Sequence, residues 1–381
     1  MRYHSVVDRK NDLDAIAAEL DVETSRRAST SDALLDLLRQ MVVRGASDMF
    51  LVAGLTPVFR INGAVTPCGG EILDGRDIEV MVWSALPAHA KMRWREGRVA
   101  DCSFRVSSLG RFRINLHRER GRAAATVRLL PTAIPTLAEL HLPPGLELLS
   151  KLGPGLVLIG GATGSGKTTT LASIIDLINR RDKKHIITIE DPIEYDHQHH
   201  ASVVEQVEIG TDCTDFAIAL RDAVRQAPDV LVVGEMRDPE TMRTALAAAE
   251  TGHVVFSTLH TTDVASTVGR IADSFPPERQ PTIRQELAMA LSAVLTQRFV
   301  PTIDGGRVPA CELLIVGYGA RQHIRKNALH HLHQEITITR KHGSFTLEEH
   351  LHKLVAQNVV RREEALARAQ HGEELERLLS A

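Results

Sequence analysis

The chain has 381 residues, of which 43% are hydrophobic and 24% are charged, a composition typical of a globular protein with more than one domain. Its 45 Lys and Arg residues are balanced by 48 Asp and Glu residues, and the net charge of -3 argues against a protein that coats nucleic acid through positive charge. No stretch reaches the roughly 20 apolar residues of a membrane-spanning helix, and the N-terminus has no apolar signal core, so we expect a cytoplasmic protein.

The cysteines and histidines follow no metal-binding pattern. The cysteines lie far apart and predict free thiols: Cys68, Cys102, Cys213 and Cys311. The 18 histidines include the clusters 197–200 and 330–333, but their spacing matches no ligand set, and we interpret them as polar surface residues.

The first part of the chain predicts a small α+β domain. Residues 1–30 are polar and lack apolar periodicity, so we interpret them as a weakly ordered extension. From Ser31 to Val42 leucines recur at helical spacing, and Gly45 ends this amphipathic helix. Four stretches predict strands, and Asn62-Gly63 predicts a turn after the second of them: 49–53, 58–61, 100–106 and 111–116. The domain is therefore expected to span residues 31–130.

A proline-rich segment separates this domain from the rest of the chain. Because prolines at this density are typical of connectors, we predict a linker over residues 131–150 and a second domain over 151–381. In the second domain, short apolar runs alternate with helical segments, which predicts an α/β domain with a mostly parallel, buried sheet: 156–159, 186–189, 230–233 and 254–256. The last 100 residues are expected to be mainly helical, with one charged amphipathic helix over 361–379.

A complete phosphate-binding loop follows the run 156–159. Its residues are Gly161, Ala162, Thr163, Gly164, Ser165, Gly166, Lys167 and Thr168, with Thr169 in the helix that follows. Glycines let successive backbone N–H groups point at phosphate oxygens, and the helix N-terminus adds its positive dipole end. The pattern predicts that Lys167 reaches the β and γ phosphates of ATP and that the Thr168 hydroxyl binds Mg²⁺.

Two acidic residues follow further apolar runs. Glu190 comes after the run 186–189, and Glu235 comes after the run 230–233. Nucleotide sites of open α/β sheets lie at the carboxyl ends of the strands, where both acids are expected. One carboxylate would activate the attacking water, and the other would hold Mg²⁺ directly or through water.

Histidines and arginines complete the candidate site. His253 and His260 flank the strand-like run 254–256, and a neutral imidazole near a triphosphate can bond or sense the γ phosphate. The first domain contributes several arginines, of which Arg113 and Arg128 are our candidates for residues that stabilise phosphoryl charge across a subunit interface.

Together these motifs resemble the secretion ATPase superfamily, and within it the PilT-type ATPases that power retraction of type IV pili. The phosphate loop, the acidic box 188–194, the second acidic motif 234–238 and the histidine box 251–262 follow in that family's order and spacing. The similarity extends from about Ser31 to about Leu379. The chain departs from the family's helical motif at residues 319–325, which keep both arginines of the motif but not its first isoleucine or its leucine. The chain shows neither the larger N-terminal region nor the four-cysteine insertion of assembly and type II secretion ATPases, which favours retraction.

The resemblance implies a homohexameric ring whose subunits have an N-terminal PAS-like domain and a RecA-like P-loop ATPase domain with a helical C-terminal part. It further implies ATP and Mg²⁺ as cofactors, arginines supplied by the N-terminal domain, Glu190 as the base and Glu235 as the organiser of metal and water. An inner-membrane platform protein would be the partner, which would place the ring at the cytoplasmic face of the inner membrane.

Three other functions remain open from the sequence. The chain could be a related type II or type IV secretion or conjugation ATPase, or a nucleotide-binding regulatory subunit in a mixed ring with a paralogous retraction ATPase. A nucleic-acid motor is disfavoured by the net charge and by the aromatic content of 4%, which leaves few stacking platforms for bases. We therefore expect no nucleic-acid partner.

Overall fold

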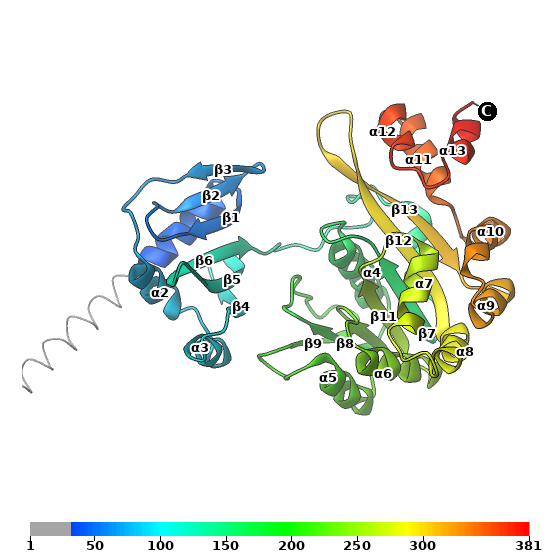
Figure 1. Ribbon diagram of the computed structural model, residues 1–381, viewed down its shortest axis with the longest axis horizontal. Coiled ribbons are helices and arrows are strands. Elements are labelled where there is room, and N and C mark those ends of the chain that lie inside the picture. The colour runs from blue at the N-terminus through cyan, green and yellow to red at the C-terminus, as the bar shows by residue number, and fades with distance from the viewer. Residues whose placement is uncertain (1–31, 381) are drawn as a thin grey trace, which may run out of the picture. The chain divides into compact units, whose positions relative to one another are not determined.

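The computed structural model describes residues 32–380 and divides the chain into two compact units, unit 1 (Met1–Thr132) and unit 2 (Ala133–Ala381) (Figure 1). The predicted N-terminal extension over residues 1–30 lies outside the described residues. Among the helices within residues 32–380, none is both long and apolar enough to cross a membrane.

Unit 1 is built on an antiparallel sheet. Its strands are β1 (Ala46–Leu51), β2 (Val58–Ile61), β3 (Ala64–Pro67), β4 (Ala100–Val106), β5 (Gly110–Glu119) and β6 (Arg122–Leu129), in the order β3-β2-β1-β6-β5-β4. A helix over 32–43, α2 (Gly75–Trp83) and α3 (Ala88–Arg95) complete the unit. The predicted turn at Asn62-Gly63 is confirmed: both residues have positive φ and join β2 to β3.

The alternation along β5 separates the two faces of this sheet. Phe112, Ile114 and Leu116 are fully buried in the core, together with Leu38 of the first helix. Residues 111, 113 and 115 are half-buried and lie on the opposite face, because successive side chains of a strand point to opposite sides. Arg113 is therefore presented on the face of the sheet away from this core.

Unit 2 is built on a seven-stranded sheet in which only β13 is antiparallel to its neighbour. Its strands are β7 (Gly155–Gly160), β8 (His185–Glu190), β9 (Val203–Glu208), β10 (Val230–Val233), β11 (Val254–Leu259), β12 (Leu291–Pro301) and β13 (Arg307–Ile315), in the order β13-β12-β7-β11-β10-β8-β9. The predicted mostly parallel sheet is confirmed, and β7, the strand that leads into the phosphate-binding loop, lies inside it with a neighbour on each side.

Helices cover both faces of this sheet. One face packs against η1 (Pro144–Lys151) and α4 (Lys167–Arg181). The other face packs against α5 (Phe216–Ala223), α6 (Pro239–Glu250), α7 (Val264–Asp273), α8 (Gln280–Ala290), α9 (Tyr318–Arg325) and α10 (Leu332–Ile338). Side chains along β7 alternate between the two cores: Leu156 and Leu158 belong to one, and Val157 and Ile159 to the other. Burial on both faces explains why these strands are continuous apolar runs in the sequence.

The C-terminal part differs from its prediction in two places. Residues 291–315 form the hairpin β12–β13, although we expected mainly helix there. The predicted single helix over 361–379 is wrong, since it is two helices, α12 (Arg362–Leu366) and α13 (Gly372–Ser380), with a break between them. Together with α11 (Leu347–Ala356), these helices pack on the outer end of the β12–β13 hairpin through a small separate core (Figure 1).

The connector is also shorter than the predicted linker over 131–150. Four leucines of that segment are buried against α4 and the sheet of unit 2: Leu137, Leu142, Leu146 and Leu149. In addition, the hydroxyl of Ser173 on α4 donates to the Pro135 carbonyl at 2.6 Å. The prolines marked the boundary between the units, but the leucines between them pack onto unit 2.

Candidate active site

The phosphate-binding loop joins β7 to α4 in a conformation that needs its glycines. Gly166 precedes α4 with φ of 87°, in the left-handed region. A Cβ on Gly161 would lie 2.4 Å from the Ser165 hydroxyl and 2.6 Å from the Gln297 carbonyl oxygen, so no larger residue fits there. The loop backbone can therefore curl tightly at the start of the helix, as phosphate binding requires.

Lys167 is folded into this loop. Its side chain is buried, and Nζ donates to the carbonyl oxygens of Gly161 at 2.8 Å and Ala162 at 3.0 Å. Burial lowers the pKa of the lysine, while the carboxylates of Glu235 and Glu194 act in the opposite direction. The ammonium group is thus held in the concave side of the loop by two neutral acceptors that phosphate oxygens can replace.

The loop and the nearby strand β12 each have a buried polar atom without a hydrogen-bond partner, and this supports a polar ligand. Among the described residues, the Ser165 hydroxyl and the Gln297 Oε1 are buried without a hydrogen-bond partner, while Gln297 Nε2 donates to the Ser165 carbonyl at 2.6 Å. Leaving such atoms unpaired costs free energy that a bound ligand can recover. A triphosphate with its associated water fits this environment.

The residues predicted for Mg²⁺ are suited to it. Thr168 is half-buried in the first turn of α4, and the Glu235 side chain is 15% exposed. Within residues 32–380, no group of three or more His, Cys, Asp or Glu side chains is placed to hold a metal ion by itself. A magnesium ion in a nucleotide site takes one or two protein oxygens and the rest from nucleotide and water, and a function of Thr168 and Glu235 as its ligands remains a prediction.

Glu190 ends β8 beside the end of β10. The Gly234 amide donates to the Ile189 carbonyl at 2.8 Å, and a Cβ on Gly234 would lie only 3.1 Å from that oxygen, so this glycine allows the close approach of the two strand ends. The Glu190 Oε1 accepts from the Thr188 hydroxyl at 2.7 Å and from Gln206 Nε2 at 3.1 Å. Burial raises the pKa of Glu190, and these hydrogen bonds partly oppose that rise.

Glu235 and His260 lie together at the same edge of the sheet. Glu235 forms an ion pair with Arg237, and His260 Nε2 lies 3.4 Å from the other carboxylate oxygen of Glu235. The other ring nitrogen of His260 is 3.4 Å from the Thr163 hydroxyl of the phosphate-binding loop. His260 therefore connects the loop to the acidic residue that follows β10.

His253 does not join the phosphate-binding loop of its own subunit. In the parallel pair β7–β11, Val254 lies opposite Gly155 and Leu259 opposite Gly160, so His253 precedes the amino end of its strand. At about 3.3 Å per residue, it is about 20–23 Å from the loop that follows Gly160. Its Nδ1 contacts the Ala248 carbonyl at 2.9 Å. The sequence placed both histidines in one motif, but the strand between them carries them to opposite ends of the sheet.

The two candidate arginines belong to unit 1 and pair there with carboxylates. Arg113 donates to Asp101 through two bonds, Nε to Oδ1 at 2.9 Å and Nη2 to Oδ2 at 2.8 Å. Arg128 Nε donates to Asp48 Oδ1 at 2.8 Å, and 61% of the Arg128 side chain remains exposed. A function of either arginine at an ATP site of another subunit remains a prediction.

The sequence analysis missed three polar residues at this site. Gln206 and Gln297 come from β9 and β12, two strands that were not predicted, and Tyr195 places its hydroxyl 2.9 Å from that of Thr169. A glutamine in a largely apolar segment, such as Gln297 in 291–300, was the available signal, because buried polar side chains need a partner.

The four predicted free thiols are confirmed: Cys68, Cys102, Cys213 and Cys311. Cys102 and Cys311 are buried, whereas Cys68 and Cys213 are half-buried.

Comparison with known proteins identifies the family. A family model described as type II/IV secretion system protein matches residues 36–379. The type IV pilus retractation ATPase PilT of Pseudomonas aeruginosa is 38% identical over 88% of this chain and 98% of its own length. The type IV pilus ATPase PilU of the same species is 38% identical over 89% of each chain. A crystal structure of the pilus retraction motor PilT with bound ADP matches with a TM-score of 0.80 and 41% identity, over 90% of this chain and 98% of that one.

The match extends across both units of the chain. The chain therefore belongs to the type II/IV secretion system protein family, and within it to the PilT-type ATPases.

Proposed function

We propose that this protein is a motor ATPase that hydrolyses Mg-ATP to drive retraction of type IV pili. The observation that carries the proposal is the arrangement at one edge of the unit 2 sheet. Lys167 begins α4 after the phosphate-binding loop, Glu190 ends β8, and Glu235 and His260 follow β10 and β11. The similarity to PilT over nearly the whole chain supports retraction as the use of this ATPase.

The two units have separate tasks in this proposal. Unit 1, an antiparallel sheet with a helical layer, is a PAS-like domain, and unit 2, a parallel sheet with helices on both faces, is a RecA-like ATPase domain. Six subunits form a ring, and an inner-membrane platform protein receives the force, so that the ring works at the inner membrane from the cytoplasm.

Binding begins at the loop between β7 and α4. Backbone amides and the N-terminus of α4 hold the phosphates, and Lys167 exchanges the Gly161 and Ala162 carbonyls for phosphate oxygens. Thr168 and Glu235 would hold a magnesium ion, whose positive charge would neutralise the phosphates.

Glu190 is the base in this mechanism. It removes a proton from the attacking water, and its raised pKa makes it a stronger proton acceptor than an exposed glutamate. Thr188 and Gln206 fix the position of its carboxylate. Glu235, held by Arg237 and near His260, orients water and metal and passes the state of the site to the phosphate-binding loop through the His260–Thr163 contact.

Arg113 and Arg128 act on the nucleotide of a neighbouring subunit. A guanidinium group is permanently charged and can bind phosphate through two parallel bonds, as Arg113 now binds Asp101. In the closed ring, phosphate oxygens compete with Asp101 and Asp48 for these two groups.

Steady-state turnover of the purified protein tests the site. We expect Lys167→Ala to abolish ATP binding, and Glu190→Gln to lower kcat by about 100-fold or more while nucleotide binding is kept, since general base catalysis contributes 10²–10⁴-fold. Lys151→Ala, on η1, is the matched control and should behave as wild type. Unchanged turnover in both site variants would refute the site.

A gene deletion tests the biological function. Loss of a retraction motor leaves excess surface pili and abolishes surface motility, whereas loss of an assembly ATPase leaves no pili. A deletion strain with normal pili and normal motility would point to another secretion machine.

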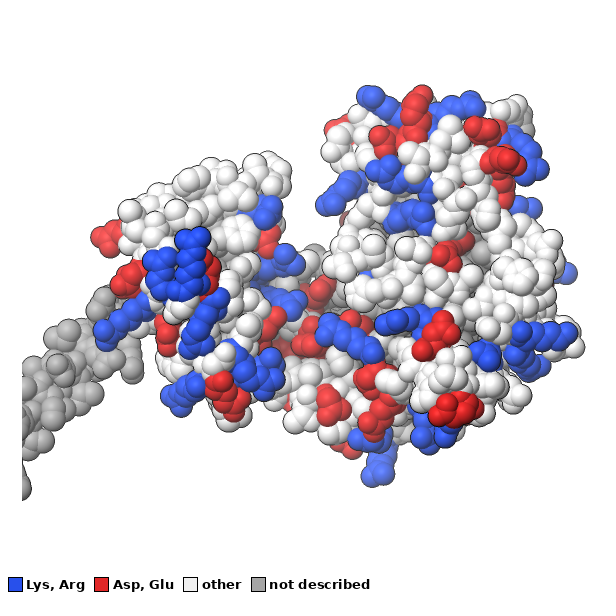
Figure 2. Space-filling model, viewed as in Figure 1, with Lys and Arg blue, Asp and Glu red and all other residues white. Residues whose placement is uncertain are grey.

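A second candidate is a regulatory subunit in a mixed ring with a paralogous retraction ATPase, because two different pilus ATPases of one species, PilT and PilU, are each 38% identical to this chain. Nucleotide binding without hydrolysis by the purified chain, with turnover only when the paralogue is added, would favour this function. A nucleic-acid partner is not part of either proposal; acidic and basic side chains are interspersed on the face shown in Figure 2, and DNA should leave turnover unchanged.

A further inference from the structure

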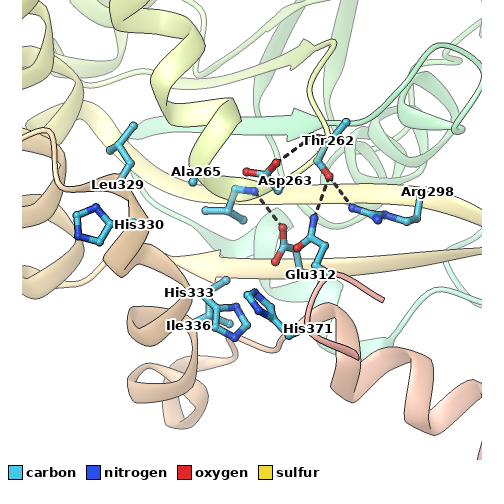
Figure 3. Close-up of a pocket in the computed structure, with 12 residues that line it drawn as sticks. Thr262, Asp263, Ala265, Arg298, Glu312, Leu329, His330, His333, Ile336 and His371 are labelled. Atoms are coloured by element: carbon cyan, nitrogen blue, oxygen red, sulfur yellow. Dashed lines mark hydrogen bonds between the residues drawn. The ribbon is translucent and has the colours of Figure 1, made fainter. Parts of the chain in front are cut away.

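A backbone carbonyl in the loop that carries His260 is hydrogen-bonded to side chains from the C-terminal part of unit 2. The Thr262 carbonyl oxygen accepts two hydrogen bonds, from Arg298 Nη2 at 2.7 Å and from Gln370 Nε2 at 3.3 Å (Figure 3). Arg298 lies on β12, and Gln370 lies in the break between α12 and α13. We call these two hydrogen bonds to the Thr262 carbonyl the clamp. Thr262 is only two residues after His260, so the clamp lies directly next to the histidine.

Arg298 fastens a second carbonyl as well. Its Nη1 donates to the Arg368 carbonyl at 3.1 Å, so one planar guanidinium group joins the His260 loop to the chain that follows α12. Glu348 on α11 also holds the break between α12 and α13. Its side chain is fully buried, and its Oε1 accepts hydrogen bonds from the backbone amides of Gln370 at 2.9 Å and His371 at 2.8 Å. The break that ended the predicted helix is therefore a defined structure with its own bonds.

Side-chain packing does not fill the space beside this clamp. A cavity of about 480 Å³ opens there, lined by Thr262, Arg298 and Gln370 together with residues of β13 and α10 (Figure 3). With open volume on this side, the hydrogen bonds of Arg298 and Gln370 hold the His260 loop to the C-terminal helices in place of close apolar contact.

Neighbouring side chains of β12 reach both parts of the ATP site. Gln297 donates to the Ser165 carbonyl in the phosphate-binding loop, and Arg298, the next residue, donates to Thr262. Successive residues of a strand point to opposite sides, so β12 connects the phosphate-binding loop on one side and the His260 loop on the other. A shift of the C-terminal helices can therefore reach the His260 loop through Arg298 without first moving the phosphate-binding loop.

We propose that Arg298 is a positioning residue of this ATPase: by holding the Thr262 and Arg368 carbonyls at once, it fixes the loop that carries His260 and couples the His260–Glu235 contact to the C-terminal helices. This inference rests on the proposed function of His260 and Glu235. The position of His260 and the position of α11–α13 then change together. This gives the nucleotide state a route to the break between α12 and α13, where Gln370 lies 108 residues after Thr262.

Turnover of the purified full-length chain tests the coupling. We expect Arg298→Gln to lower kcat at least tenfold with KM for Mg-ATP changed less than threefold, because the phosphate-binding loop keeps its hydrogen bonds to Lys167 and Gln297. The kcat of Arg298→Lys should lie between those of wild type and Arg298→Gln, since an ammonium group cannot bond both carbonyls in one plane as a guanidinium group does. Arg362→Gln, an exposed arginine on the neighbouring α12, is the matched control and should equal wild type.

Amide hydrogen exchange separates this inference from the proposed function. A nonhydrolysable ATP analogue with Mg²⁺ should protect residues 161–169 and also residues 366–372 in wild type, but only residues 161–169 in Arg298→Gln. Absence of protection at 161–169 in wild type would show that the proposed nucleotide site itself is wrong.

Protection at 161–169 without a change at 366–372 in wild type, or equal protection at 366–372 in the variant, would overturn the coupling, as would an unchanged kcat. Should Arg298→Gln fail to fold, Gln370→Leu removes only the second donor to Thr262 and should reduce both kcat and the protection at 366–372 to a smaller extent. Wild-type values in that variant and in Arg298→Lys would equally overturn it.

Discussion

Removing the hydroxyl of Thr188 is the most direct test of Glu190 as the base. Thr188 is 1% exposed on β8, and its hydroxyl donates to Glu190 Oε1 at 2.7 Å. Thr188→Val keeps the shape of the side chain and removes only this donor. Because the hydrogen bond stabilises the ionised carboxylate, its loss raises the pKa of Glu190 beyond the rise that burial already causes.

The magnitude follows from the type of bond. A hydrogen bond to a charged group contributes about 1.5–3 kcal/mol, and about 1.4 kcal/mol corresponds to a factor of ten in an equilibrium. On the acidic side of the pH profile, where Glu190 must lose its proton to act, kcat/KM of Thr188→Val should therefore fall at least about tenfold. At alkaline pH the carboxylate is ionised in both proteins, and the variant should approach wild type.

The assay is the pH dependence of kcat/KM for Mg-ATP, measured for wild type, Thr188→Val and Thr188→Ser. Serine keeps the hydroxyl donor and loses only a methyl group, so Thr188→Ser should retain the wild-type profile. An acidic limb that stays in place in Thr188→Val, or an equal loss of activity at every pH, would refute the assignment of Glu190 as the base.

Three further predictions concern stability and nucleotide affinity. Burial raises the pKa of Glu190 in the folded state, so ionising this carboxyl costs stability once the pH rises above its pKa in the unfolded state. In urea titrations, Glu190→Gln should therefore be as stable as wild type near about pH 4 and more stable than wild type at about pH 8. Equal stability of the two proteins at both pH values would contradict this. Gly166→Ala places a methyl group at φ of 87° and 3.2 Å from Gln297 Nε2, and should cost about 1–2 kcal/mol of unfolding free energy and weaken ATP binding in calorimetry; an unchanged affinity would show that the loop tolerates strain. His253→Ala should leave the ATP affinity within about twofold of wild type and cost about 1 kcal/mol for the lost Ala248 contact, and a large loss of affinity would place this histidine at a nucleotide after all.

Local patterns were sufficient where burial is uniform along a segment. The runs at 156–159, 186–189 and 230–233 predicted β7, β8 and β10 within one or two residues, because a strand buried on both faces leaves a continuous apolar run between turn residues. The hairpin β12–β13 was missed because β12 mixes apolar residues with Ser292, Thr296, Gln297 and Arg298 without a regular alternation. In addition, α8 continues into β12 without a loop to separate them.

The sequence by itself determined the family, the phosphate-binding loop and the two acidic residues, since these depend on residue types at fixed local spacing. Only the tertiary structure decided which of them meet. Strand register separates His253 from His260, side-chain geometry pairs Glu190 with Thr188 and Gln206, and chain distant in sequence brings Arg298 and Gln370 to the Thr262 carbonyl. Contacts between residues far apart in the chain depend on how strands pair and helices pack, and no local pattern in the sequence records that arrangement.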